Sequence, residues 1–406
     1  MRFEKLTFEN EEGTRLAARL DLPVDGEPIA YALFAHCFTC SKNLKAVANI
    51  SRAMNRQGLA VLRFDFTGLG ESEGDFADTN FSSNIDDLIA AAVFLEEEYE
   101  APSILVGHSL GGAAVLQAAV QLDSVRAVAT IGAPYDPHHV EHLFEGSLQE
   151  IEHRGEARVS IGGRPFTVKK QFLDDLKDQR VKENLSRLHR PLLIFHSPVD
   201  NTVGIENAAL IFKAARHPKS FVSLDHADHL LTDAADSEYV GTVLAAWARK
   251  YIGARQEDRK QTDLDDNQVV ARLEGAGYRT EMLANGFPLI ADEPVEVGGT
   301  NTGPTPYDYL VAALGACTAM TLRMYADHKG WPLETIEVRL NHDKIHAKDC
   351  EDCEEKEGMV DRVQRELVFT GPLDEAQRRR LVEISNRCPV HRTLERRIHI
   401  VTALKD

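Results

Sequence analysis

A serine between two glycines is the first feature of the sequence that could do chemistry. GHSLGG (107–112) places Ser109 between an apolar run, SILVGHS (103–109), and a helical pattern, LGGAAVLQAAVQL (110–122). A sharp turn from strand to helix exposes a serine hydroxyl, and the start of the helix offers oriented N–H groups to a developing negative charge. The pattern therefore predicts a nucleophilic serine.

Such a serine needs a histidine as base, and the histidine needs an acid to orient it. Asp200 follows the apolar run LLIFHSP (192–198), and His229 comes later, in ADHLL (227–231). The competing candidates for the two roles are Asp225, His226 and Asp228. We prefer Asp200 as the acid because it lies beyond the end of its own predicted strand, and we expect Ser109, Asp200 and His229 to act together.

The segment HCFTCSK (36–42) follows another apolar run and is the second part of the predicted site. Attack on a carbonyl creates an oxyanion that two N–H donors can hold. We expect these donors to be the backbone N–H groups of Leu110 and Phe38. Cys37 and Cys40 flank this position as C-x-x-C, and they are either small packing residues or a redox pair that controls the reaction.

Alternating strands and helices must position these residues. Five apolar runs at 31–37, 59–66, 103–109, 126–134 and 192–198 alternate with helical patterns, which indicates a mostly parallel sheet with helices on both faces. Residues 136–190 interrupt this rhythm with a hairpin pattern, ARVSIGGRPFTVKK, and are predicted to form a small cap. The first domain is expected to span 1–255, followed by a charged linker at 256–266.

The remaining chain, 267–406, follows a different pattern and is predicted to be an α+β domain. Strand-like alternation at 269–294 precedes a long helix at 308–330, which is apolar on most of its circumference and therefore expected to be central. The further predicted elements are two strands at 335–345 and 363–371, an amphipathic helix at 373–388 and a closing strand at 396–404. A chain of 406 residues is too long for one ordinary domain, in agreement with this division.

The motifs of the first half together resemble the α/β-hydrolase superfamily, and within it serine esterases of the feruloyl and cinnamoyl esterase type. HCFTCSK, DFTGLGES (65–72) and GHSLGG carry the resemblance, which covers about 1–255. It implies the α/β-hydrolase fold and hydrolysis of esters. Both glycines of the usual loop are replaced by cysteine, at Cys37 and Cys40.

The second half contains Cys317 in the long helix and Cys388 at the end of another helix, where two thiols could form a reversible couple. GGTNTGPTP (298–306), the run to Cys317, and RCPVHRTL (387–394) resemble the OsmC/Ohr family over about 267–406. The resemblance implies an intertwined homodimer that reduces organic hydroperoxides at the expense of a dithiol, with Cys317 peroxidatic and Cys388 resolving.

Two further features of this half concern the cation that could activate a thiol and a possible metal site. The family's glutamate position holds Tyr307, next to Asp308, and Arg279 is our candidate for the activating cation. The segment that contains His342, His346, Cys350 and Cys353 has zinc-ligand residue types at tolerable spacing. Five acidic residues crowd it, so we expect a solvated acidic loop and no metal site.

The net charge of the chain limits the classes of molecule that it is expected to bind. With 46 basic and 64 acidic residues the net charge is −18, which disfavours binding to nucleic acids or anionic membranes. The acidic, polar start and the lack of 18 consecutive apolar residues favour a cytoplasmic protein without a membrane span. We expect a serine hydrolase of small acyl or aromatic acyl esters or thioesters, without a cofactor. The alternatives for the second half are a hydroperoxide reductase at Cys317 and Cys388, and a non-catalytic dimerisation or ligand-binding scaffold.

Overall fold

Two compact units make up the chain in the computed structural model. The structure describes residues 2–24, 27–37, 40–161, 164–177, 179, 181–252, 269–273, 275–346 and 358–404. One unit comprises Met1–Arg272 with Glu281–Leu289, and the other Leu273–Thr280 with Ile290–Asp406. The predicted linker at 256–266 and the positions Phe38, Cys350 and Cys353 lie outside the described residues.

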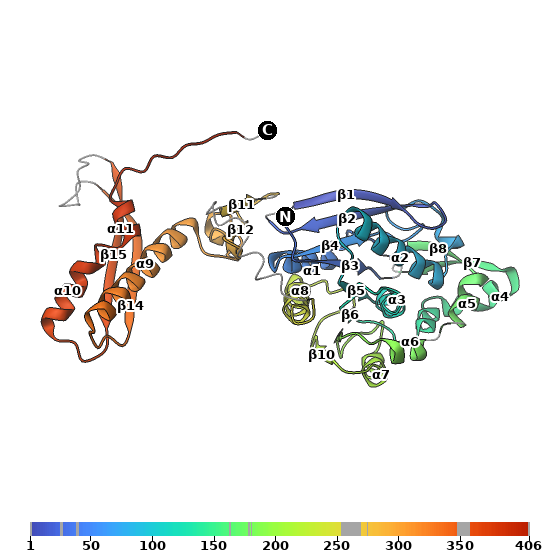
Figure 1. The fold of residues 1–406 in the computed structure, drawn as a ribbon. Coiled ribbons are helices and arrows are strands. Elements are labelled where there is room, and N and C mark those ends of the chain that lie inside the picture. Colours follow the sequence, from blue (N-terminus) through green and yellow to red (C-terminus); the bar gives the residue numbers. More distant parts are fainter. Residues whose placement is uncertain are drawn as a thin grey trace. The chain divides into compact units, whose positions relative to one another are not determined.

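An eight-stranded sheet forms the centre of the first unit (Figure 1). Its spatial order is β1-β2-β4-β3-β5-β6-β9-β10. The strands are β1 (Arg2–Glu9), β2 (Arg15–Leu22), β3 (Ala30–Ala35), β4 (Leu59–Phe64), β5 (Ile104–His108), β6 (Ala127–Ile131), β9 (Leu192–His196) and β10 (Lys219–Ser223). The pairs β1–β2 and β2–β4 are antiparallel, whereas the pairs from β4 to β10 are parallel. The mostly parallel sheet predicted from the five apolar runs is confirmed.

Helices cover both faces of this sheet, which explains why its central strands are apolar without alternation. In β3, Leu33 packs in one cluster with residues of α2 and α3, and Phe34 packs in another with residues of α1 and α8. These helices are α1 (Lys45–Arg56), α2 (Phe81–Glu98), α3 (Leu110–Ala118) and α8 (Ala234–Ala248). The helix α7 (Glu206–Ala214) joins the first cluster, and the short η1 (Phe76–Asp78) precedes α2.

The predicted cap is an insertion between β6 and β9. It contains η2 (Pro137–Ser147), α4 (Leu148–Arg154), the antiparallel hairpin of β7 (Glu156–Ile161) and β8 (Arg164–Lys169), α5 (Lys170–Lys177) and α6 (Val181–Arg187). Buried residues on the cap, such as Phe144, Ile151 and Leu173, belong to the same cluster as α2 and α3. The cap is therefore packed onto the first unit as part of its core.

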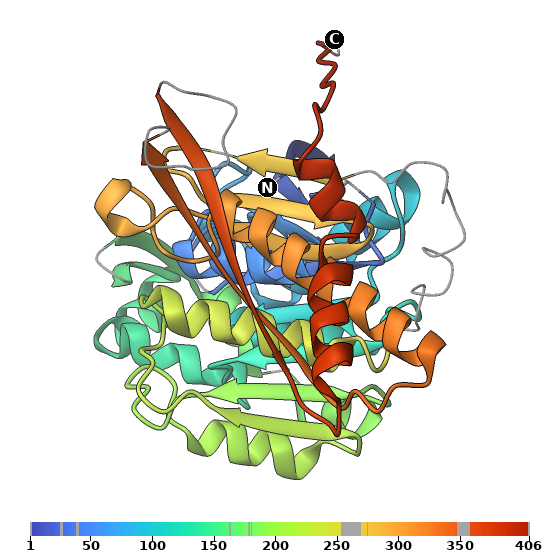
Figure 2. The same ribbon diagram turned by 90° about the vertical axis from the view of Figure 1, so that its left-hand side faces the viewer.

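The C-terminal residues fold as the expected α+β domain. β14 (Ile336–His346) and β15 (Met359–Phe369) form a long antiparallel ribbon, and α9 (Pro306–Lys329) packs on β14 (Figure 2). Both α10 (Glu375–Ser385) and α11 (Pro389–Leu394) pack against α9. A separate three-stranded sheet contains β11 (Val269–Leu273), β12 (Thr280–Ala284) and β13 (Phe287–Ala291), and η4 (Val295–Val297) follows it.

Two apolar stretches of this half are covered less than their composition suggests. Only Leu314, Gly315, Thr318, Leu322 and Ala326 of α9 are buried, so the helix is covered along one stripe, although β14, α10 and α11 all pack against it. Residues 396–404 form no strand in the described chain, and Ile400 is 80% exposed. In both cases the sequence shows apolar residues that the elements within the described part of the chain leave largely uncovered.

By length and composition, α9 is also the one helix of the described residues that could cross a membrane. Central helices of globular domains pass the same test. α9 contains Arg323 and Asp327, which pair with each other at 3.5 Å, and it packs on β14 and α10.

Candidate functional site

A strained backbone position presents Ser109 between β5 and α3. Its φ is 55° and its ψ −126°, in the left-handed half of conformational space that residues other than glycine rarely enter. The Ser109 N–H donates to the Ile131 carbonyl at 2.8 Å, which fixes the turn to β6. The flanking glycines are required, because a Cβ on Gly107 would lie 2.2 Å from the Gly111 carbonyl oxygen and one on Gly111 2.4 Å from the His36 carbonyl oxygen.

A continuous chain of hydrogen bonds joins the three residues that the sequence predicted to act together. Nε2 of His229 lies 2.9 Å from Oγ of Ser109, and Nδ1 of His229 lies 2.7 Å from Oδ2 of Asp200. The other carboxylate oxygen of Asp200 accepts from the backbone N–H groups of Thr202 and Val203, at 2.8 and 2.9 Å. Burial raises the pKa of Asp200, but these bonds outweigh burial and hold the pKa below its usual range, so the acid is ionised.

The parallel sheet explains how these distant residues meet. Ser109 follows β5, Asp200 follows β9 and His229 follows β10, and the strands β5, β6, β9 and β10 are neighbours in that order. The carboxyl ends of parallel strands lie at one edge of a sheet, where loops gather side chains from separate segments.

The competing acids have other partners. Asp225 accepts from the Ser223 hydroxyl at 2.9 Å, and Asp228 accepts from the Thr232 backbone N–H at 3.0 Å. Neither carboxylate is in the hydrogen-bond chain that contains His229.

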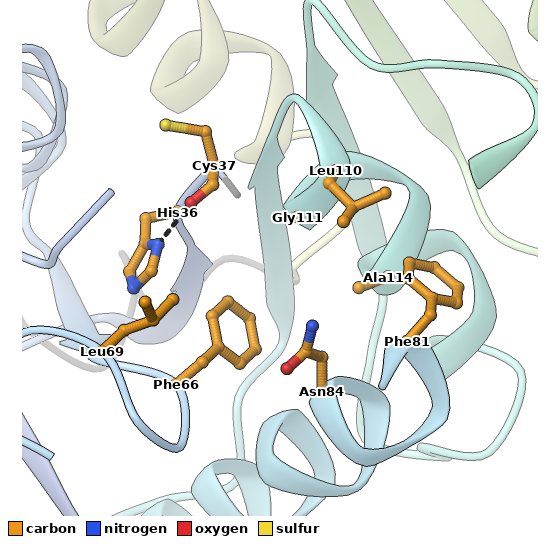
Figure 3. Close-up of a pocket in the computed structure, with 9 residues that line it drawn as sticks. All are labelled: His36, Cys37, Phe66, Leu69, Phe81, Asn84, Leu110, Gly111 and Ala114. Carbon is orange, nitrogen blue, oxygen red and sulfur yellow. Dashed lines mark hydrogen bonds between the residues drawn. The ribbon is translucent and has the colours of Figure 1, made fainter. Parts of the chain in front are cut away.

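Of the two expected oxyanion donors, Leu110 lies within the described residues and Phe38 does not. Leu110 is the first residue of α3, where backbone N–H groups have no partner within the helix. Phe38 lies outside the described residues, but its neighbours Cys37 and Cys40 are joined by a disulfide. Cys37 lines a mostly apolar recess together with Leu110 and Gly111 (Figure 3). Cys37 and the start of α3 therefore border the same space.

A buried ionic network that the sequence analysis missed holds the exit of this loop. The backbone N–H of Lys42 donates to Oδ1 of Asp65 at 2.6 Å, and its Nζ donates to Oδ2 of Asp65 at 2.5 Å and to Glu71 at 2.6 Å. The Lys42 carbonyl accepts from Arg63, whose Nε also pairs with Asp21 at 2.7 Å. DFTGLGES is thus a structural motif here: Asp65 anchors the loop that begins at Cys37. Charged residues inside apolar runs, such as Arg63 in LAVLRF, were the available signal.

His108 is a second residue that sequence reasoning did not single out. Its Nε2 donates to the backbone carbonyl of His229 at 2.6 Å, and the two rings lie 5.1 Å apart. Burial lowers the pKa of His108 to about 3, so the ring is neutral at pH 7. His108 thus supports the backbone of the histidine that contacts Ser109.

In the second unit, the structure brings the two predicted redox cysteines together. Cys317 of α9 and Cys388, directly before α11, share a side-chain hydrogen bond. Burial and this bond raise the pKa of the Cys317 thiol; burial also acts on Cys388, but the hydrogen bonds that it accepts lower the pKa of its thiol. The two thiols thus titrate as a pair, and the family resemblance gives the peroxidatic role to Cys317.

A cation that acts on these thiols comes from β15. Arg365 interacts electrostatically with Cys388 and donates to Oγ of Ser385 at 2.9 Å and to Oγ1 of Thr318 at 3.2 Å. For Arg279, our candidate from the sequence, the activating role stays a prediction. Nothing in the spacing of VQRELVF marked Arg365, because its role depends on how β15 packs against the helices.

The remaining candidates lie at the ribbon. Tyr307 stacks on His342 with ring centroids 4.3 Å apart, and Nε2 of His342 lies 2.8 Å from Asp361. Asp308 caps α9 through Thr305, whose hydroxyl donates to it at 2.8 Å. Within the described residues, no group of three or more His, Cys, Asp or Glu side chains is arranged to hold a metal ion, and Cys350 and Cys353 lie outside them.

Comparisons with known proteins match the two halves separately. Residues 28–155 match the family model "Serine aminopeptidase, S33", and residues 299–403 match the model "OsmC-like protein". Among curated proteins, the mitochondrial palmitoyl-protein thioesterase ABHD10 of Rattus norvegicus is 25% identical over 213 residues, which are 50% of this chain and 70% of the relative.

Solved structures match the first half. The esterase domain of a Rhodothermus marinus protein is 58% identical, with a TM-score of 0.53, and the match covers 62% of this chain and 100% of that domain. Est1E from Butyrivibrio proteoclasticus, solved with ferulic acid, is 21% identical with a TM-score of 0.51, over 61% of this chain and 99% of its own. At that identity the likeness to Est1E concerns the fold.

Proposed function

Because the chain belongs to the α/β-hydrolase family in its N-terminal half and carries an OsmC domain in its C-terminal half, we propose that the first half is a serine esterase of small carboxylic esters or thioesters. The observation that carries the proposal is the hydrogen-bond chain Ser109–His229–Asp200 at 2.9 and 2.7 Å. The esterase domain that is 58% identical supports the same chemistry.

Ser109, His229 and Asp200 each have one task in this mechanism. Oγ of Ser109 attacks the ester carbonyl while Nε2 of His229 takes its proton. Asp200, held ionised by its hydrogen bonds, orients His229 and stabilises the imidazolium. The N–H groups of Leu110 and Phe38 hold the oxyanion, His229 returns the proton to the leaving alcohol or thiol, and water then releases the acid from Ser109.

Replacing the nucleophile tests the proposal directly. We expect Ser109→Ala to lower the kcat for p-nitrophenyl acetate by at least about 10³-fold and to abolish labelling by a fluorophosphonate. Ser223→Ala is the matched control, because this serine is exposed and its hydroxyl donates to Asp225, outside the Ser109–His229–Asp200 hydrogen bonds. Turnover retained in Ser109→Ala would show that the nucleophile lies elsewhere.

The proposed esterase must also select the acyl group of its substrate. The thioesterase relative favours thioesters, and the resemblance of HCFTCSK, DFTGLGES and GHSLGG to feruloyl and cinnamoyl esterases favours aromatic acyl esters. We therefore propose small or aromatic acyl groups, bound as esters or thioesters. A panel of p-nitrophenyl, acyl-thioester and methyl hydroxycinnamate substrates, ranked by kcat/KM, separates these classes.

A second candidate function belongs to the OsmC domain, and the hydrogen bond between Cys317 and Cys388 favours it. We propose a hydroperoxide reductase: a thiolate attacks the peroxide, which leaves as an alcohol, and the sulfenic acid condenses with the other thiol to a disulfide and water. A dithiol then reduces this disulfide. Without this activity, the domain would serve as a dimerisation or ligand-binding scaffold.

Peroxide consumption distinguishes these roles. We expect the wild type to consume cumene hydroperoxide with dithiothreitol, and both Cys317→Ser and Cys388→Ser to lose at least about 100-fold of this rate. The hydrolase variant Ser109→Ala is the control and should keep the full rate. Equal rates in wild type and Cys317→Ser would leave the scaffold as the role of the domain.

We also propose that the protein is a homodimer through this domain and works in the cytoplasm. The support for the dimer is apolar surface on α9, where Met320 and Met324 are 65% and 72% exposed. The support for the compartment is the acidic composition, and cell fractionation would test it.

A further inference from the structure

We propose that Cys37 and Cys40 form a second reactive site in the hydrolase half, a dithiol–disulfide couple that exchanges with small thiols and thereby sets the rate of ester hydrolysis. The inference rests on the proposed esterase function, because the couple acts through the loop that follows β3. The two cysteines are joined in the structure, with Cα atoms 5.3 Å apart. They stand on both sides of Phe38, the expected second oxyanion donor.

The couple is close to the start of α3. Cys37 is 4% exposed and lines the same recess as Leu110 and Gly111 (Figure 3). The backbone before it packs tightly against this helix, since a Cβ on Gly111 would lie 2.4 Å from the His36 carbonyl oxygen. A backbone shift at Cys37 therefore changes the surroundings of the Leu110 N–H, the first oxyanion donor.

Both ends of the loop are held by bonds that do not involve sulfur. At the entry, Nδ1 of His36 donates to the Cys37 carbonyl at 2.8 Å (Figure 3). At the exit, Lys42 is fixed to Asp65 by two hydrogen bonds, at 2.6 and 2.5 Å. Between these anchors, the Cys40 N–H donates to the Cys37 carbonyl at 3.1 Å, and the disulfide is the covalent link. Reduction therefore removes one link and leaves the anchors and the fold in place.

Thiol–disulfide exchange at this site follows from the exposure of the two sulfur-bearing residues. Cys40 is half-buried while Cys37 is buried, so an incoming thiolate attacks the sulfur of Cys40 and Cys37 leaves as a thiolate. A second thiol of the reductant attacks the mixed disulfide and releases Cys40. Two electrons reduce the protein disulfide, and two reductant thiols become one disulfide. A small-molecule disulfide reverses the reaction.

The disulfide form is the faster esterase in this proposal. Removal of a whole oxyanion donor lowers kcat by about 10²–10³-fold. Reduction leaves the Leu110 donor and both anchors in place, so we expect a smaller loss. We expect kcat to fall by roughly tenfold on reduction and KM to change by less than about twofold, since the effect is on the transition state.

The experiment uses the full chain and measures thiols and rates on the same sample. The protein is treated with dithiothreitol, freed of it by anaerobic gel filtration, and assayed with p-nitrophenyl acetate. A second aliquot is alkylated with iodoacetamide and digested with trypsin, which releases residues 20–42 as one peptide with both cysteines. We expect two alkyl groups on this peptide together with the tenfold loss of kcat, and recovery of the rate after oxidised glutathione.

Two variants identify the responsible sulfurs. Cys40→Ser should have the kcat of the reduced enzyme and no response to dithiothreitol, and the glycine pair Cys37→Gly/Cys40→Gly should also lack the response. Cys317→Ser/Cys388→Ser is the control and should respond like the wild type. A fully alkylated peptide with unchanged kcat overturns the inference, and so does a peptide that stays unalkylated. Failure of the esterase proposal itself would appear separately, as hydrolysis retained in Ser109→Ala.

Discussion

At the scale of residues, His229 is held from two directions. Its ring contacts Asp200, and its own backbone carbonyl accepts a hydrogen bond from His108 at 2.6 Å. His108 is the residue directly before Ser109, so one strand end fixes both Ser109 and the loop of His229. We propose a positioning role for His108, exerted through the backbone of His229.

Removing this hydrogen bond should slow the reaction without weakening substrate binding. For His108→Ala we expect kcat to fall roughly tenfold, the equivalent of about 1.4 kcal/mol, with KM nearly unchanged. His108→Gln keeps an N–H donor and should recover most of the rate. Steady-state kinetics on p-nitrophenyl acetate measures both variants, and a rise in KM at constant kcat would contradict the positioning role.

At the scale of elements, the loop between β3 and α1 depends on buried charge. Lys42 is 4% exposed and pairs with Asp65, which is fully buried. Breaking a buried pair by removing one partner leaves an uncompensated charge, which typically costs about 3–5 kcal/mol. The pair of Lys42 with Glu71 is different, because the Glu71 side chain is 63% exposed.

We therefore expect Lys42→Met to lower the free energy of unfolding of the first unit by about 3 kcal/mol or more. Glu71→Gln is the matched control and should cost about 1 kcal/mol or less. Urea unfolding followed by Trp247 fluorescence, in a Trp331→Phe background, measures the first unit alone. Equal losses of unfolding free energy in the two variants would mean that Lys42 does not stabilise the buried carboxylate of Asp65.

Elements also show how far the sequence could predict this structure. The apolar runs predicted β3, β4, β5, β6 and β9, and with them the positions of Ser109 and Asp200, because strands buried on both faces have an unmistakable composition. The order of strands and the partner of Lys42 depend on contacts between distant segments. The covering of α9 could not be predicted either, since an apolar face indicates that a partner exists but does not identify it.

At the scale of the whole molecule, buried neutral histidines limit stability in acid. Burial lowers the pKa values of His36, His108 and His196, with that of His108 at about 3. Between the unfolded value of about 6.5 and the folded value, the unfolded chain binds protons that the folded chain does not. Stability is therefore retained above about pH 6.5 and is lost as the pH falls below it.

For His108 alone, we expect the free energy of unfolding to fall by about 2 kcal/mol as the pH is lowered from 6.5 to 5. We expect the urea midpoint of the first unit to fall over this interval, and His108→Gln to show a shallower fall than the wild type. A midpoint that is constant from pH 7.5 to 5 would show that these histidines are not neutral in the fold.

The apolar surface of α9 gives a second prediction at this scale. We expect the chain to elute as a dimer, with twice its mass of 45.1 kDa in multi-angle light scattering. Met324→Asp places a charge on the exposed face and should shift the protein towards the monomer without loss of ester hydrolysis, because Ser109, His229 and Asp200 all belong to the first unit. A monomeric wild type would contradict the dimer.

The position of the cap has a consequence for engineering. It leaves the sheet after β6 and returns before β9 as one continuous segment, and it contributes none of the three residues of the hydrogen-bond chain. Its tether to the acid loop is the bond from His139 to the Thr202 carbonyl, at 2.8 Å. A graft of another hydrolase's cap between these two strands must therefore keep the donor to Thr202 and the apolar residues that join the core, such as Phe144, Ile151 and Leu173. With these retained, we expect the graft to change substrate preference while Ser109, His229 and Asp200 remain in place.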